Sequence, residues 1–89
     1  MIYTIYITQA ALKRLEALPL KLRASIEQRV FALENNPRPR GALKLKGPKY
    51  QGWRIRAGKY RVIYTIDDSA HAVDVLVIDL RDQAYHARD

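Results

Sequence analysis

A chain of 89 residues without cysteine is long enough for one domain with a modest core, and it excludes disulfides and thiolate metal sites. Its longest apolar runs are too short to span a membrane, and its N-terminus lacks the charged start and cleavage site of a signal peptide. We therefore expect a single cytoplasmic domain over residues 1–89, and the net charge of +7 favours a polyanionic partner.

The first predicted elements are a strand and a helical hairpin. Residues 2–7 alternate as a strand that is apolar on both faces, and Thr8 is a predicted N-cap for a helix from Gln9 to about Leu18. Pro19 interrupts, and a second helix should reach Leu33 or Glu34 before Asn35-Asn36-Pro37 ends it. The apolar positions with helical spacing are Ala11, Leu12, Leu15 and Leu18 in the first helix and Leu22, Ile26, Val30 and Leu33 in the second.

The second half of the chain reads as short strands joined by turns. Leu43 to Lys46 alternates and is predicted as a short edge strand. Residues 53–57 and 60–66 are predicted to form a hairpin, and Gly58-Lys59 suits a type II′ turn because glycine comes first. A turn over residues 67–71 leads into a β-branched strand over residues 72–80, and residues 81–89 form a short helical turn or a loose tail.

This element order predicts an α+β fold. An N-terminal strand and an α-helical hairpin precede an antiparallel three-stranded meander, and the helices pack on one face of the sheet. The other face is then free to be concave and charged. The positive charge is concentrated between Asn35 and Ile66, a stretch that contains no acidic residue. Its basic residues are Arg38, Arg40, Lys44, Lys46, Lys49, Arg54, Arg56, Lys59 and Arg61.

Strand alternation gathers several of these arginines. Arg54 and Arg56 share one strand face, opposite Trp53, which we expect in the core with Ile55. Arg61 lies inside an otherwise apolar strand, where an arginine is costly unless it has a partner or opens onto a wet cleft. Two interpretations stand at this point. In one, Arg61 and Arg81 pair with Asp74 or Asp79; in the other, the hairpin arginines, Arg81 and Tyr85 form a patch that binds the phosphates and bases of RNA.

Standard catalytic motifs are absent from the sequence. There is no Walker loop, no dinucleotide-binding glycine pattern and no nucleophile elbow. His71 and His86 are too few for a metal cluster. We expect His71 to be solvated in its turn, and His86 is a minor candidate for a base.

Two runs carry a family resemblance. Trp-Arg-Ile-Arg-Ala-Gly-Lys-Tyr-Arg-Val-Ile-Tyr and, after a turn, Val-Leu-Val-Ile-Asp-Leu-Arg-Asp-Gln-Ala-Tyr resemble the RelE/ParE superfamily of type II toxins, on the RelE side. The upstream segment Leu-Lys-Leu-Lys-Gly and the order of the predicted elements also match the family pattern, so the resemblance covers nearly the whole chain. It implies a toxin that cleaves mRNA in the ribosomal A site through 2′-hydroxyl attack, leaves a 2′,3′-cyclic phosphate, needs no metal or other cofactor, and is neutralised by a cognate antitoxin.

The resemblance also implies roles for individual residues. Arg54 and Arg56 match basic residues that act near the 2′-hydroxyl and the scissile phosphate, and Arg61 matches an arginine that stabilises that phosphate. Arg81 matches an arginine that stabilises the phosphate or protonates the leaving group. Tyr85 matches an aromatic residue that stacks on the substrate base. The expected RNA-binding lysines are Lys44, Lys46, Lys49 and Lys59.

The chain departs from the family pattern at two places. Arg54 and Arg56 stand where lysine would be a reasonable general base, and arginine stays protonated, so the base must come from elsewhere or from the ribosome. Leu80 stands where many relatives carry histidine.

Two alternative functions belong to other classes. One is a ParE-like DNA gyrase inhibitor without catalysis; such relatives generally lack the full basic-plus-tyrosine set, so Arg81 and Tyr85 favour RelE. The other is a non-toxic remnant or plain RNA-binding module.

Overall fold

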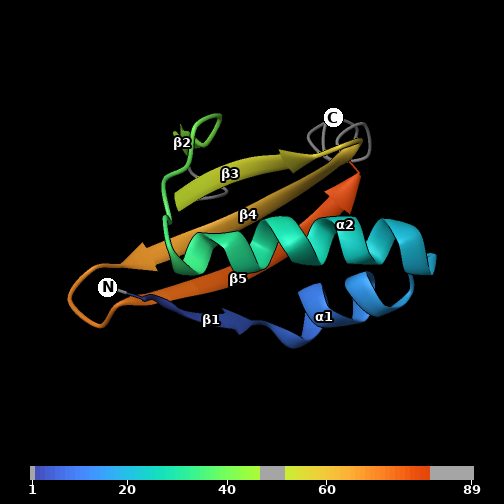
Figure 1. Cartoon of the computed structure of the whole chain (residues 1–89), viewed down its shortest axis with the longest axis horizontal. Coiled ribbons are helices and arrows are strands. Elements are labelled where there is room, and N and C mark those ends of the chain that lie inside the picture. Colours follow the sequence, from blue (N-terminus) through green and yellow to red (C-terminus); the bar gives the residue numbers. More distant parts are fainter. Residues whose placement is uncertain (1, 47–51, 81–89) are drawn as a thin grey trace.

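The computed structural model describes residues 2–46 and 52–80. Figure 1 shows the elements along the chain. They are β1 (Thr4–Ile7), α1 (Gln9–Glu16), α2 (Leu20–Phe31), the short 3-10 helix η1 (Ala32–Glu34), β2 (Leu43–Leu45), β3 (Gly52–Ala57), β4 (Tyr60–Asp67) and β5 (Ala72–Leu80).

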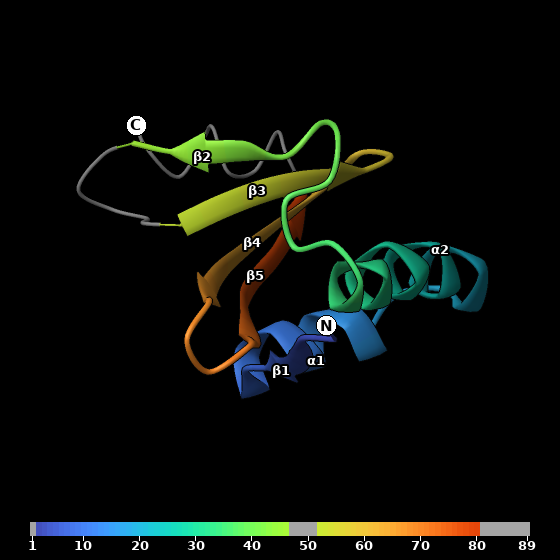
Figure 2. The ribbon, with the colours of Figure 1, turned by 60° about the vertical axis from the view of Figure 1, so that its left-hand side comes forward.

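The strands form one five-stranded sheet in the order β1-β5-β4-β3-β2. Strands β2 to β5 pair antiparallel in chain order, which confirms the predicted meander and places β2 at an edge as expected. β1 closes the other edge in parallel to β5, with Thr4 beside Ala72. Both helices lie on the same side of the sheet (Figure 2), so the predicted α+β architecture is confirmed.

Helix α1 begins where the sequence predicts and ends slightly earlier. The Thr8 side chain accepts a hydrogen bond from the Ala11 N–H at 3.2 Å, as an N-cap does. The helix ends at Glu16 rather than at Leu18, and the Leu18 N–H bonds to the Leu15 carbonyl in a tighter turn. Pro19 explains the early end, because proline disfavours helical backbone at the residue before it.

The second helix also changes form near its end. α2 stops at Phe31, and one 3-10 turn continues to Glu34, where the sequence predicts the helical segment to finish. Three of its predicted apolar positions, Ile26, Val30 and Leu33, are completely buried. The helical spacing therefore identified the face that packs on the sheet.

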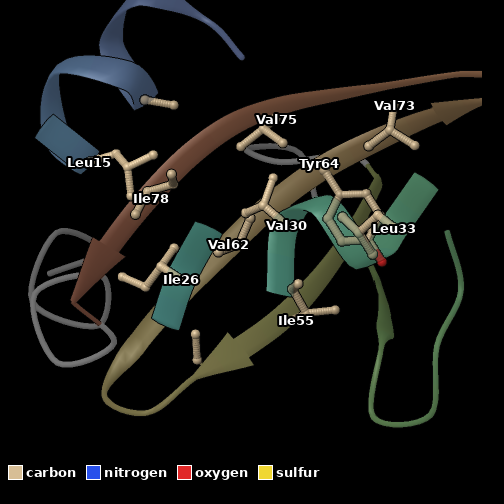
Figure 3. Close-up of a cluster of buried hydrophobic side chains, with 12 residues drawn as sticks. Leu15, Ile26, Val30, Leu33, Ile55, Val62, Tyr64, Val73, Val75 and Ile78 are labelled. Atoms are coloured by element: carbon tan, nitrogen blue, oxygen red, sulfur yellow. The ribbon is translucent and has the colours of Figure 1, made fainter. Parts of the chain in front are cut away.

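The core lies between the helices and one face of the sheet (Figure 3). Tyr64 is its largest fully buried side chain, and its hydroxyl donates a 2.7 Å hydrogen bond to the Pro37 carbonyl. Burial raises the pKa of Tyr64 to about 12. The buried side chains of this cluster are Ala11, Leu15, Ile26, Val30, Leu33, Ile55, Ala57, Val62, Tyr64, Val73, Val75 and Ile78.

The hairpin between β3 and β4 has the predicted turn. Gly58 has a φ of +62°, while Lys59 is not among the described residues with positive φ, which is the pattern of a type II′ turn. Farther along, a register shift between Ile63 and Tyr64 leaves Leu76 of β5 as an extra residue. A bulge of this kind bends the strand and increases the local twist.

A polar cluster, here called the Asp68 latch, ties the loops at one end of the sheet. The Arg38 guanidinium donates two hydrogen bonds to the Asp68 carboxylate, at 3.2 and 2.8 Å, and the Tyr3 hydroxyl donates a third at 2.7 Å. Arg38 also lies 5.3 Å from the centre of the Trp53 ring. The prediction that His71 is simply solvated is wrong, because its half-buried ring meets Tyr3 edge-on at 5.4 Å.

Candidate functional site

The hairpin places three arginines on one face of the sheet. Arg56 of β3 lies directly opposite Arg61 of β4, and Arg54 lies two residues earlier on β3. Residues directly opposite in an antiparallel pair point to the same side of the sheet, as do residues two apart along one strand. Arg54, Arg56 and Arg61 therefore share the face away from the helices, here called the arginine face.

The alternate side chains of β3 point to the other face and pack in the core, as predicted. Ile55 and Ala57 are buried under the helices, and Trp53 packs partly buried against the same cluster. The strand alternation therefore separates apolar from cationic side chains.

The arginines of this face differ in exposure. Arg54 is only 7% exposed, Arg61 is half-buried and Arg56 is exposed. Nη1 of Arg54 and Nε of Arg61 are buried atoms. Ile63 shares this face because it lies opposite Arg54, and it is fully buried. Packing therefore restrains Arg54 and Arg61, while the Arg56 guanidinium stays accessible to a ligand.

The acidic residue that lies beside Arg61 in the sheet has a partner on α1. Asp79 lies opposite Arg61 in the register, but its carboxylate forms an ion pair with Arg14 of α1. The part of the chain that the structure describes contains no ion pair between Arg61 and either Asp74 or Asp79. The Asp79 carboxylate is therefore held by Arg14 of α1.

The predicted RNA-binding lysines do not gather at one place. Lys59 is exposed at the hairpin turn that joins the two arginine-bearing strands, and Lys46 is exposed just after β2. Lys44 lies opposite Trp53, so its side chain projects from the helix-bearing face of the sheet. Lys49, Arg81, Tyr85 and His86 lie outside the described residues.

A pocket of about 400 Å³, here called the β3-edge pocket, adjoins the arginine face. It lies where α2, the loop before β2 and the β3 edge meet, and Figure 2 shows that loop beside β3. Its lining residues are Arg29, Ala32, Pro39, Arg40, Gly41, Arg54, Ile55 and Arg56. Sequence reasoning missed Arg29 here, because helix periodicity alone does not tell which exposed helical residue reaches a distant strand.

Comparisons with known proteins give a consistent result. A family model described as "ParE toxin of type II toxin–antitoxin system, parDE" matches residues 5–85. A Mycobacterium tuberculosis protein named Toxin RelE is 37% identical over 84 residues, covering 93% of this chain and 86% of that protein. The chain belongs to the RelE/ParE superfamily of toxins. It is a RelE-family toxin of the type II toxin–antitoxin class.

Solved structures of similar fold agree with this assignment. The archaeal RelE–RelB complex from Pyrococcus horikoshii OT3 contains a chain with a TM-score of 0.79 and 29% identity, covering 91% of this chain and 97% of that one. The toxin–antitoxin complex RelBE2 from Mycobacterium tuberculosis gives a TM-score of 0.78 and 31% identity, covering 91% of this chain and 100% of that one.

No described helix of this toxin is long and apolar enough to cross a membrane.

Proposed function

We propose that this RelE-family toxin is a ribosome-dependent endoribonuclease that cleaves mRNA in the ribosomal A site and thereby stops translation. The observation that carries the proposal is the arginine face, where Arg56 and Arg61 lie opposite each other and Arg54 adjoins them. Three guanidinium groups on a rigid hairpin suit a phosphodiester, because arginine binds phosphate through paired hydrogen bonds and stays charged. In the proposed complex the RNA strand lies across β3 and β4.

The proposed reaction is an intramolecular transfer within the RNA. The ribose O2′ attacks the adjacent phosphorus, the O2′–P bond forms and the P–O5′ bond breaks. The products are a 2′,3′-cyclic phosphate and a 5′-hydroxyl. A base takes the proton of the 2′-hydroxyl, and the departing O5′ gains one. No electron transfer or metal ion is needed for this balance.

The arginines act on charge rather than as the base. The transition state places extra negative charge on the phosphate oxygens, and prearranged cations lower its energy more than that of the ground state. Arg61 and Arg56 are assigned to these oxygens, with Arg54 beside the 2′-hydroxyl. Because guanidinium does not lose its proton, the base comes from the RNA, the ribosome or another residue of the toxin.

Residues outside the described part complete the proposal. Arg81 is assigned to phosphate stabilisation or protonation of O5′, and Tyr85 to stacking on the substrate base. Lys46, Lys49 and Lys59 are assigned to RNA phosphates, with Lys59 best placed beside the hairpin, whereas Lys44 projects from the helix-bearing face and is left out of this contact. We place the toxin in the cytoplasm, where translating ribosomes are found.

An antitoxin is the proposed protein partner. The complexes from Pyrococcus horikoshii and Mycobacterium tuberculosis each pair a toxin of this fold with an antitoxin. The net charge of +7 makes an acidic antitoxin segment the complementary partner. Co-expression with the neighbouring open reading frame should restore growth if that frame encodes it.

The test compares three purified variants with the wild-type toxin on ribosomes that are programmed with a defined mRNA. Arg61→Gln should lower the rate of A-site cleavage by about 100-fold or more, since removal of one transition-state donor has an effect of this order. Arg61→Lys should retain part of the rate because it keeps the charge. Arg23→Gln serves as the control, because Arg23 pairs with Glu27 on α2, away from the arginine face.

Thermal unfolding of the same proteins separates chemistry from folding. The proposal predicts that Arg61→Gln loses cleavage while its melting temperature stays near that of Arg23→Gln. A native wild-type toxin that leaves A-site mRNA intact would refute the proposal. Loss of cleavage in proportion to lost stability would assign Arg61 to the fold instead.

A further inference from the structure

The β3-edge pocket has an unusual electrostatic lining. Four of the described residues that line it are arginines, and none of these described residues is acidic. β2 pairs only with residues 52–54 of β3, so on this side of β3 no described strand lies beside Ile55 and Arg56, which pair with β4 on their other side. The pocket therefore opens where the sheet edge is uncovered.

Arg29 and Arg40 lack the carboxylate partners that three other arginines of the described chain have. Arg14, Arg23 and Arg38 form ion pairs with Asp79, Glu27 and Asp68. Among the described residues, Arg29 and Arg40 have no carboxylate within the 4.0 Å of an ion pair. The Arg29 Nη1 donates to the backbone carbonyl of Arg56 at 3.3 Å, which holds Arg29 of α2 against the edge of β3.

We infer that this pocket is a second RNA subsite, which binds a nucleotide that flanks the cleaved bond. The inference rests on the proposed RNA substrate and extends it to residues that the hairpin pattern does not reveal. Arg29 and Arg40 bind the phosphodiester of that nucleotide, and Ala32, Pro39 and Ile55 supply an apolar wall for its ribose or base.

Continuity with the arginine face supports this choice of occupant. Arg54 and Arg56 line the pocket and also belong to the arginine face, so one strand of RNA can run from one to the other. A volume of about 400 Å³ falls within the usual range of small-ligand sites. Successive phosphates of one strand match successive cationic positions better than an isolated anion does.

The test measures binding of RNA that cannot be cleaved. Fluorescently labelled 2′-O-methyl RNA strands of three and nine nucleotides are titrated with the purified toxin at several salt concentrations, and anisotropy reports binding. Arg40→Gln should weaken binding of the long strand by about 3- to 10-fold and reduce the salt slope by about 0.7, the value for one phosphate contact with single-stranded RNA. Arg29→Gln should act similarly, and both together should reduce the slope by about 1.4.

The short strand and a matched variant provide the controls. The three-nucleotide strand, which the arginine face alone can hold, should bind these variants within about twofold of wild type. Arg23→Gln removes the same charge from α2 outside the pocket, and it should leave the long strand within about twofold. Arg40 is exposed, so its replacement tests the pocket without disturbing the core.

Each outcome decides the inference. Equal effects of Arg40→Gln, Arg29→Gln and Arg23→Gln on the long strand would overturn it, because they would reflect overall charge. Unchanged RNA binding together with lost binding of a labelled polyglutamate peptide would overturn it in favour of an acidic protein partner. A pocket effect on RNA binding in a toxin that does not cut A-site mRNA would support the subsite and refute the proposed cleavage.

Discussion

Gly52 stands at a position of β3 where a side chain meets the backbone of β4. A Cβ atom there would lie within 2.4 Å of the Tyr64 carbonyl oxygen, and the residue has a φ of +114°. The close contact excludes a side chain unless the strands move apart, and the positive φ is strained for any residue other than glycine. The close approach at Gly52 also fixes where β3 begins beside Tyr64, and so helps to set the positions of Arg54 and Arg56.

Gly52→Ala should therefore destabilise the toxin by about 1–3 kcal/mol, the usual cost of a strained backbone position, and lower its midpoint in urea. Gly41→Ala is the matched control, because Gly41 also has a positive φ, +94°, but no atom of the described residues lies within 4 Å of where its Cβ would be. Equal midpoints for the two variants would show that backbone conformation alone, and not the contact with β4, limits position 52.

Single residues were predicted from sequence where a local rule decides them. Thr8 as the cap, Gly58 as the first turn residue, and the separation of Arg54 from Ile55 follow from short-range geometry, and the structure has all three. The environment of His71 depends on Tyr3, which lies far away along the chain, and no local pattern contains that contact.

At the scale of elements, the Asp68 latch joins three segments. Arg38 precedes β2, Asp68 belongs to the turn between β4 and β5, and Tyr3 precedes β1. The Arg38 guanidinium and the Tyr3 hydroxyl hold the pKa of Asp68 at about 2, below the ordinary value of 3.8. The carboxylate is thus more acidic in the folded chain than in the unfolded chain.

This difference predicts a loss of stability in acid. The unfolded chain takes up a proton at Asp68 first as pH falls, so the contribution of Asp68 is complete above about pH 4 and disappears as pH falls to about 2. Urea midpoints of the wild type should fall over this range, and Asp68→Asn should show a shallower fall. The pKa of Asp67 is also lowered, by hydrogen bonds within its turn, so the stability of the Asp68→Asn variant should still depend on pH to some extent. Parallel pH profiles for the two proteins would contradict the prediction.

Element types were more predictable from the sequence than their long-range pairing. Helical spacing in α2 and alternation in β3 require only neighbouring residues, so Ile26, Val30 and Ile55 were assigned correctly to the core. The parallel pairing of β1 with β5 joins opposite ends of the chain, and no turn between them specifies it. The β3-edge pocket escaped prediction for the same reason, since α2, a loop and a strand edge contribute to it.

At the scale of the whole molecule, charge and shape are divided between the two faces of one sheet. The helices cover one face and form the core with it, while the other face carries Arg54, Arg56 and Arg61. A cationic face of this kind attracts either RNA or DNA, since both carry phosphates. The RelE-type and ParE-type targets, translation and DNA gyrase, produce different effects in cells.

The RelE-type target predicts a specific order of events in cells that express the toxin. Incorporation of labelled amino acids should stop, mRNA should acquire cuts within translated codons, and the supercoiling of a reporter plasmid should stay unchanged. Arg61→Gln should lose the first two effects together, because it removes the proposed contact to the scissile phosphate without removing core volume. DNA damage that requires gyrase, with intact mRNA and continued early protein synthesis, would instead identify a ParE-type inhibitor and assign the arginine face to a protein or DNA contact.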